Sequence, residues 1–202
     1  MSVLAIISTV VSVVCAVCTT VSAVCRVAES VVSLGKSLGI IKSPESQEQI
    51  GERCLAADEQ GITPEKFNND YSAYMNAVNN IDMTSIDKSR WTTKAKALRA
   101  IEFASDAIIH EIAPSMKVGA ERAILAIANH PESDFYTAER METYIRADGE
   151  GRMDIRNCVD YLEGKPCGDV KSVRQQLADV ECSMDSSLSK GAALDKIDYV
   201  RS

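Results

Sequence analysis

Aromatic residues are scarce in this chain of 202 residues: Phe, Trp and Tyr make up 5% of the sequence, and the first of them is Phe67. The N-terminal segment therefore lacks the Trp and Tyr residues that many membrane-spanning helices place at the lipid–water boundary. The 5 prolines and 10 glycines are too few for a collagen-like or low-complexity chain. Hydrophobic residues make up 46% of the sequence, which excludes a wholly disordered chain. These proportions predict a globular protein.

Residue types that usually carry chemistry are also sparse or scattered. The 2 histidines, His110 and His130, have no histidine or cysteine partner at the short spacing typical of a metal site. The 7 cysteines follow no recurring spacing, which argues against a disulfide framework and a zinc site. Cys15 and Cys18 have a redox-like spacing but lack the strand–helix context of a redox motif. We expect a protein that is not an enzyme and has no catalytic residue, cofactor or metal.

One segment has the outline of a calcium-binding loop. Residues 146–157 place acidic side chains at three ligand positions of an EF-hand, namely Asp148, Glu150 and Asp154. The first and last positions hold Arg146 and Asn157 instead of the carboxylates that calcium needs. We therefore interpret this segment as a polar turn between two helices.

Charge is unevenly distributed along the sequence. The whole chain has a net charge of −7, whereas residues 1–43 have a net charge of +2, so residues 44–202 carry −9. An acidic body lacks the clustered positive surface that neutralises phosphates, and we expect no binding to nucleic acid. One basic cluster is a candidate patch for an acidic protein partner, and it consists of Lys88, Arg90, Lys94, Lys96 and Arg99.

The first 43 residues form the most distinctive segment. From Val3 to Cys25 there are 23 residues without a charge, a length that can span a bilayer. No Lys or Arg precedes this run and no clear cleavage site follows it, so the sequence predicts no cleaved signal peptide. We expect synthesis in the cytoplasm, with membrane association or export by a non-classical route as alternatives.

Apolar residues in this segment recur every seven positions. Val occupies positions 3, 10, 17, 24 and 31, and Leu occupies position 38. A seven-residue period predicts a helix with a coiled-coil seam, whereas a strand would alternate with a period of two. The predicted interface with other helices or lipid comprises Val3, Ile6, Ile7, Val10, Val13, Val14, Val17, Val21, Val24, Val27, Val31, Leu34 and Leu38.

The width of this apolar face suggests how the protein works. We expect that one acidic domain cannot conveniently bury it, and that it packs in the homo-oligomeric core of a ring, tube or filament. The hydroxyl side chains of Ser8, Ser12, Thr19 and Ser22 then face a lumen or another helix. Two alternatives remain open. The helix inserts into a bilayer as part of a secreted or injected membrane-active protein, or it is the buried first helix of a small helical enzyme.

The remaining sequence has helical periodicity throughout. Ser43-Pro44-Glu45 is typical of a helix start, which divides the chain into a hydrophobic arm, 1–43, and an acidic domain, 44–202. Apolar spacings of three and four predict helices over about 44–60, 63–79, 89–112, 115–127, 137–145, 153–163, 169–183 and 190–200. The predicted fold class is all-α, with a long hydrophobic N-terminal helix followed by a compact multi-helix domain.

Overall fold

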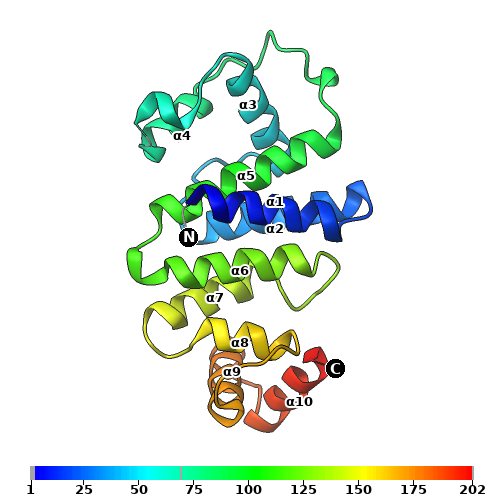
Figure 1. The fold of residues 1–202 in the computed structure, drawn as a ribbon, viewed down its shortest axis with the longest axis vertical. Helices are drawn as coiled ribbons and strands as arrows, with labels where there is room; N and C mark the ends of the chain where they lie inside the picture. Colours follow the sequence, from blue (N-terminus) through cyan, green and yellow to red (C-terminus); the bar gives the residue numbers. More distant parts are fainter. Residues whose placement is uncertain (1–2, 69, 202) are drawn as a thin grey trace.

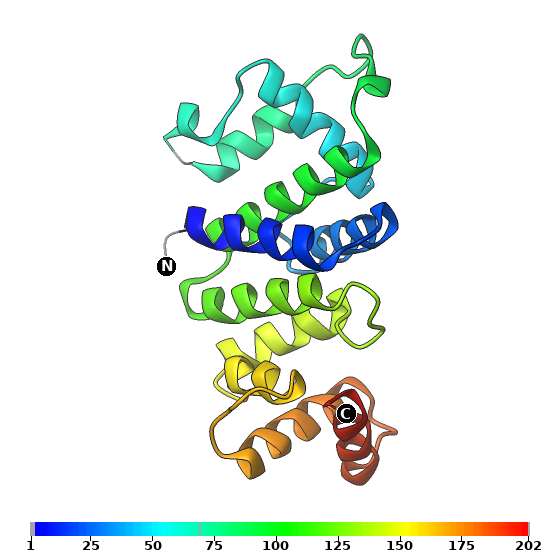
Figure 2. The same ribbon diagram turned by 45° about the vertical axis from the view of Figure 1, so that its right-hand side comes forward.

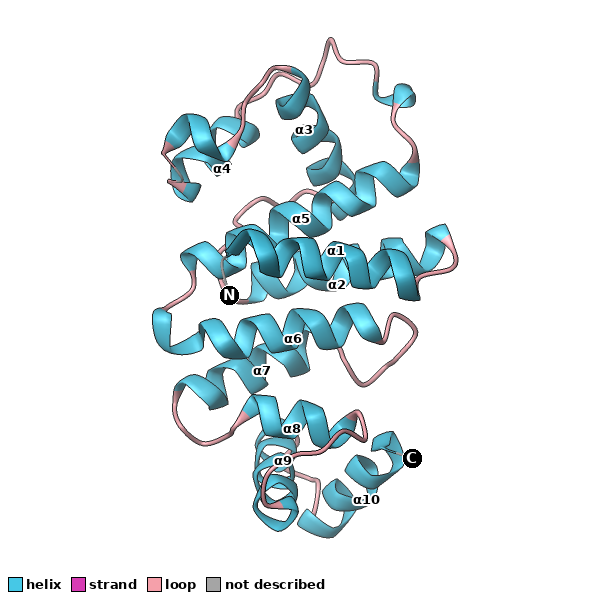
Figure 3. Ribbon diagram, in the orientation of Figure 1, coloured by secondary structure: helices cyan, strands magenta, loops and turns pink. Residues whose placement is uncertain are grey.

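The computed structural model describes residues 3–68 and 70–201, with side chains from Ser8 onward. All regular structure in these residues is helical, which confirms the all-α prediction (Figure 3). The α-helices are α1 (Val3–Val17), α2 (Val21–Ser37), α3 (Gln47–Glu59), α4 (Tyr71–Asn79), α5 (Thr93–Glu111), α6 (Lys117–Asn129), α7 (Ala138–Gly149), α8 (Ile155–Leu162), α9 (Val170–Met184) and α10 (Lys190–Arg201). Three short 3-10 helices lie between them, namely η1 (Pro64–Phe67), η2 (Lys88–Arg90) and η3 (Pro114–Met116).

Side-chain caps set the starts of most helices. Ser46 begins α3 with a capping box, in which its hydroxyl accepts a hydrogen bond from the Gln49 amide and the Gln49 side chain accepts one from the Ser46 amide. Thr92 caps α5 in the same position, so that helix starts later than the predicted residue 89. The predicted helix over 63–79 is wrong, because Asn68 has a φ of 55° and its left-handed backbone separates η1 from α4.

The helices stack along the long axis of an elongated molecule (Figures 1 and 2). α3 and α4 lie at one end, and α8, α9 and α10 lie at the other. α1 and α2 lie in the middle, where α5 covers them on one side and α6 and α7 cover them on the other. Buried side chains from all ten α-helices belong to one hydrophobic core. The N-terminal segment therefore joins the two ends of the molecule.

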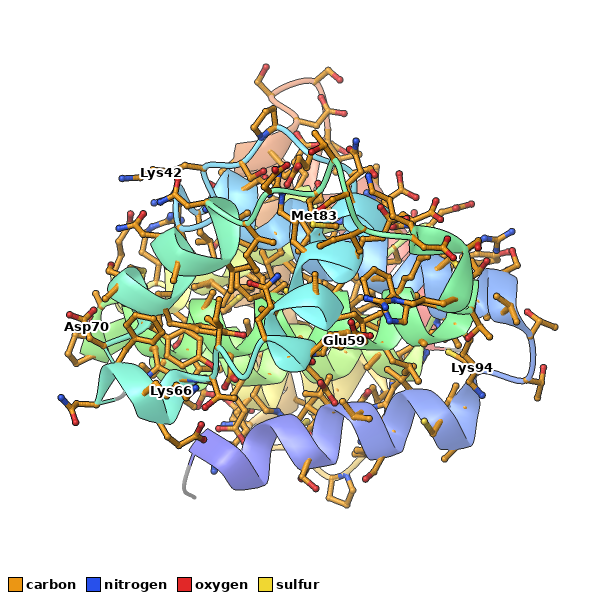
Figure 4. The ribbon with its side chains drawn as sticks, turned by 90° about the horizontal axis from the view of Figure 1, so that it is seen from above. Lys42, Glu59, Lys66, Asp70, Met83 and Lys94 are labelled. Carbon is orange, nitrogen blue, oxygen red and sulfur yellow. The ribbon has the colours of Figure 1, made fainter. Side chains whose placement is uncertain are left out.

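The prediction of one long N-terminal helix is wrong. α1 ends at Val17, and α2 starts at Val21 and runs back across the molecule, so the two helices form a helical hairpin that is open away from the turn (Figures 1 and 4). Thr20 has an extended backbone, and its Oγ1 accepts a hydrogen bond from the Ala23 amide at 3.1 Å, so it starts a new helix. The seven-residue recurrence crosses this turn and does not describe one continuous seam. None of the described helices combines the length and the hydropathy needed to cross a bilayer.

The hairpin explains how a single chain covers so wide an apolar face. On α2 the buried members of the predicted interface are Val24, Val27, Val31 and Leu34, and on α1 they are Val10 and Val14. Val13 and Leu38 are partly buried, whereas Val17 and Val21 beside the turn are 40% and 46% exposed. Val3, Ile6 and Ile7 lie outside the residues whose side chains are described. A role for this face as an interface with other molecules stays a prediction.

The boundary predicted near residue 43 falls in the loop between α2 and α3. Gly39 has a φ of +75°, a left-handed conformation that favours glycine at the end of a helix. The division into 1–43 and 44–202 coincides with this loop, and both parts contribute side chains to the same core. Independent folding of the two parts stays a prediction.

Candidate functional site

The outer side of α1 and the turn after it form an uncharged surface, which we call the α1 surface. Its exposed residues are Ser8, Thr9, Ser12, Cys15, Ala16, Val17, Thr19, Thr20, Val21 and Ser22. α1 lies along one edge of the molecule when the stack is viewed from its end (Figure 4). The hydroxyl residues that the sequence places opposite the apolar face are therefore exposed.

Helical spacing produces this surface. Val10, Val14 and Cys18 recur every four residues and are buried against the neighbouring helices, so the other side of α1 faces outward. The outward residues are small, and small side chains allow another helix to approach closely. Among the described residues, the large exposed apolar side chains are Val17, Val21, Val118, Val170 and Tyr199. Two of these five flank the α1–α2 turn, which adds apolar area to the surface.

The predicted basic patch is mostly neutralised within the chain. Four of its five cations pair with carboxylates of α3, in the pairs Lys88–Glu52, Arg90–Glu59, Lys96–Glu52 and Arg99–Asp58. These pairs attach α3 to α5 and to the segment before it. Lys94 is exposed, forms no ion pair with the described residues, and lies near the α1–α2 turn (Figure 4). Binding of an acidic partner at this patch stays a prediction.

Four of the seven cysteine thiols are poorly suited to nucleophilic chemistry. Burial raises the pKa of Cys54 and of Cys158 to about 12, and it also raises the pKa of Cys18 and of Cys25. A reactive thiol needs a lowered pKa, because the thiolate is the nucleophile. Cys15 is the one exposed cysteine of the seven, and it lies on the α1 surface. Cys18, Cys54 and Cys158 are buried in the hydrophobic core, and Cys25 packs against it.

A cluster of titratable side chains joins α4 to α5. The Tyr71 hydroxyl donates a hydrogen bond to Asp106, and the Tyr71 ring stacks on His110 with 4.2 Å between ring centroids. Burial raises the pKa of Asp106 to about 6 and lowers the pKa of His110. Ser72 donates a hydrogen bond to Glu111 at 3.1 Å, and both residues line a cavity of about 400 Å³ beneath α4. The cluster helps to hold the short helix α4 against α5.

The larger cavity lies at the other end of the molecule, and sequence reasoning missed it. It has a volume of about 730 Å³ between the α6–α7 loop, the end of α8, and α10. We call it the α10 cleft, and its lining residues are His130, Ser133, Asp134, Phe135, Tyr136, Arg140, Leu162, Lys196, Tyr199 and Val200. These residues come from three distant stretches of sequence, so no spacing pattern points to them. The adjacent aromatic pair Phe135-Tyr136 in a loop was the only available signal.

The segment that resembles an EF-hand loop is a turn between α7 and α8, as interpreted from the sequence. An oxygen of Asp148 accepts a hydrogen bond from the Ile155 amide at 3.0 Å, and Asp154 caps α8 by accepting one from the Asn157 amide at 3.1 Å. These carboxylates therefore stabilise backbone amides at the start of a helix. No group of three or more His, Cys, Asp or Glu side chains in the described ranges is arranged to hold a metal ion.

Comparison with known proteins assigns no family or fold relative to this chain. No family model, no curated protein and no solved structure matches this chain.

Proposed function

We propose that this chain is a non-enzymatic structural protein that assembles with copies of itself through the α1 surface. The observation that supports this proposal is the exposed, charge-free side of α1 on a chain with a net charge of −7. The sequence predicts assembly through the apolar face of the same segment. Since most of that face is buried in the chain's own core, the proposal uses the opposite side of the helix.

Electrostatics favours this surface over the others. Two copies of an acidic protein repel each other, and contacts between charged faces also require charges to lose water. No charged residue occurs between Val3 and Cys25, so a contact between two α1 surfaces removes no charge of this segment from water and adds no close pair of like charges within it. The contact therefore leaves the acidic faces of both copies in solvent.

The shape and chemistry of the surface also suit a helix–helix contact. Ser8, Ser12 and Ala16 follow each other at intervals of four residues and form a strip of small side chains along α1. Such a strip lets a second helix approach closely, while the hydroxyl groups can donate and accept hydrogen bonds across the contact. Val17 and Val21 add apolar contact at one end of the strip. The same surface on both copies gives a two-fold interface, which is the commonest symmetry of soluble oligomers.

Sedimentation velocity over a series of protein concentrations tests the proposal. We expect the sedimentation coefficient of the wild-type chain to rise with concentration. We expect Ser12→Glu to sediment as a monomer throughout, because it places a negative charge in the middle of the contact. Ser172→Glu makes the same substitution at an exposed serine of α9 and should assemble like the wild type.

Circular dichroism verifies that both variants remain helical, which separates loss of assembly from loss of folding. A wild-type chain that stays monomeric at all concentrations would contradict the proposal. So would a Ser12→Glu variant that assembles as the wild type does.

A further inference from the structure

Two cations that line the α10 cleft, Arg140 and Lys196, meet at one buried carboxylate. Glu181 is 1% exposed. Its carboxylate accepts hydrogen bonds from Arg140 Nε at 2.8 Å and from Lys196 Nζ at 2.8 Å. The Tyr144 hydroxyl donates a third hydrogen bond to the same carboxylate at 2.9 Å. Two cations thus share one buried carboxylate. Asp185 also attracts Lys196, but Asp185 is exposed, so water screens this attraction.

Two further carboxylates lie at the cleft, Glu163 and Asp134, and among the described residues neither forms an ion pair with Arg140 or Lys196. Glu163 is buried beside the cleft and is bonded to Lys165 at 2.6 Å and to His130 at 3.2 Å. Although burial raises its pKa, these two contacts outweigh burial and lower the pKa of Glu163 to about 2. Its negative charge is therefore already paired. Asp134 lines the cleft and is exposed to solvent, so water screens its charge.

The walls of the cleft are aromatic and aliphatic. The Arg140 guanidinium lies 4.3 Å from the centroid of the Phe135 ring, and Lys196 Nζ lies 5.8 Å from it. Leu162 and Val200 contribute aliphatic wall. Tyr199 borders the cleft and is 82% exposed, so its ring is accessible to a molecule in the cleft. A cavity with apolar walls and a few polar groups at one end is typical of a small-molecule site.

We propose that the α10 cleft binds an aromatic anion, meaning a planar ring that carries a carboxylate or phosphate group. The anionic group of the ligand lies against Lys196 and Arg140. The two cations then face two anionic groups, Glu181 and the ligand. The ring lies against Tyr199 and the aliphatic wall. The ligand is either a free small molecule or an aromatic anionic side chain of a protein, since both present the same chemistry.

Isothermal titration calorimetry of the full chain with phenyl phosphate tests this site. We expect saturable binding to the wild type and at least about tenfold weaker binding to Lys196→Gln, which corresponds to the loss of a charge-assisted hydrogen bond. Tyr199→Ala should weaken phenyl phosphate binding and leave any weak binding of inorganic phosphate unchanged. In Lys196→Gln the buried Glu181 still has Arg140 and the Tyr144 hydroxyl as hydrogen-bond donors, so we expect the fold to be retained, and circular dichroism checks this.

Lys190→Gln is the matched control, because Lys190 lies on the same helix, is exposed, and pairs with Asp179 outside the cleft. It should bind phenyl phosphate like the wild type.

A second arm of the experiment replaces phenyl phosphate with a short phosphotyrosine peptide. Tighter binding of the peptide assigns the site to a protein ligand, and tighter binding of phenyl phosphate assigns it to a small molecule. The proposal is overturned if neither probe binds saturably, if inorganic phosphate binds as tightly as phenyl phosphate, or if Lys196→Gln binds as well as Lys190→Gln.

Discussion

At the scale of single residues, the fold holds Asp106 in a position that disfavours the charged form of its carboxyl group. Burial between α4 and α5 raises its pKa to about 6, although the Tyr71 hydroxyl bonded to it and the nearby Arg99 both act in the opposite direction. The folded chain therefore binds a proton at Asp106 more tightly than the unfolded chain does. It follows that the free energy of unfolding falls as the pH rises from about 4 to about 6.

Asp106→Asn should remove this dependence on pH. The amide carries no charge to bury and still accepts the hydrogen bond of Tyr71, so we expect about 1 kcal/mol more stability at pH 7. Urea unfolding at several pH values measures the effect, with Asp195→Asn as the control at an exposed position. The prediction fails if Asp106→Asn has the same pH dependence as the wild type between pH 4 and 6.

At the scale of elements, the turn between α1 and α2 depends on one hydroxyl group. Thr20 Oγ1 accepts a hydrogen bond from the Ala23 amide at the start of α2. Thr19 beside it is exposed. Thr20→Ala should lower the free energy of unfolding by about 1 kcal/mol, the usual cost of losing such a cap. Thr19→Ala should change stability by a few tenths of a kcal/mol at most. Equal unfolding midpoints of the two variants in urea would show that Thr20 does not set the turn.

Most helices of residues 44–202 could be predicted because their signals are local, whereas the break at Asn68 between η1 and α4 was missed. Apolar spacing indicates their positions, and capping residues such as Thr137 indicate their starts. The α1–α2 turn was missed because it contains neither Gly nor Pro, and because the apolar residues on both sides of it continue a seven-residue pattern. Adjacent Thr19 and Thr20 were the available sign of a cap. The α10 cleft could not be predicted, since tertiary packing alone brings α8 and α10 to the α6–α7 loop.

At the scale of the whole molecule, the N-terminal hairpin has two sides with different roles. Its apolar side packs against α5, α6 and α7 and thereby connects the two ends of the stack. The outer side of α1 lacks charge and has no covering helix in the described part of the chain. The apolar side therefore stabilises the fold, and we propose that the outer side of α1 mediates assembly.

Alkylation of Cys15 as a function of protein concentration tests the assembly most directly. Cys15 is exposed in the single chain and lies on the α1 surface, whereas Cys182 on α9 is partly buried and lies away from it. Mass spectrometry after a short reaction with iodoacetamide measures both rates in one sample. If copies meet through the α1 surface, labelling of Cys15 slows several-fold as the concentration rises, while labelling of Cys182 stays constant. A Cys15 rate that is the same at low and high concentration would contradict assembly through this surface.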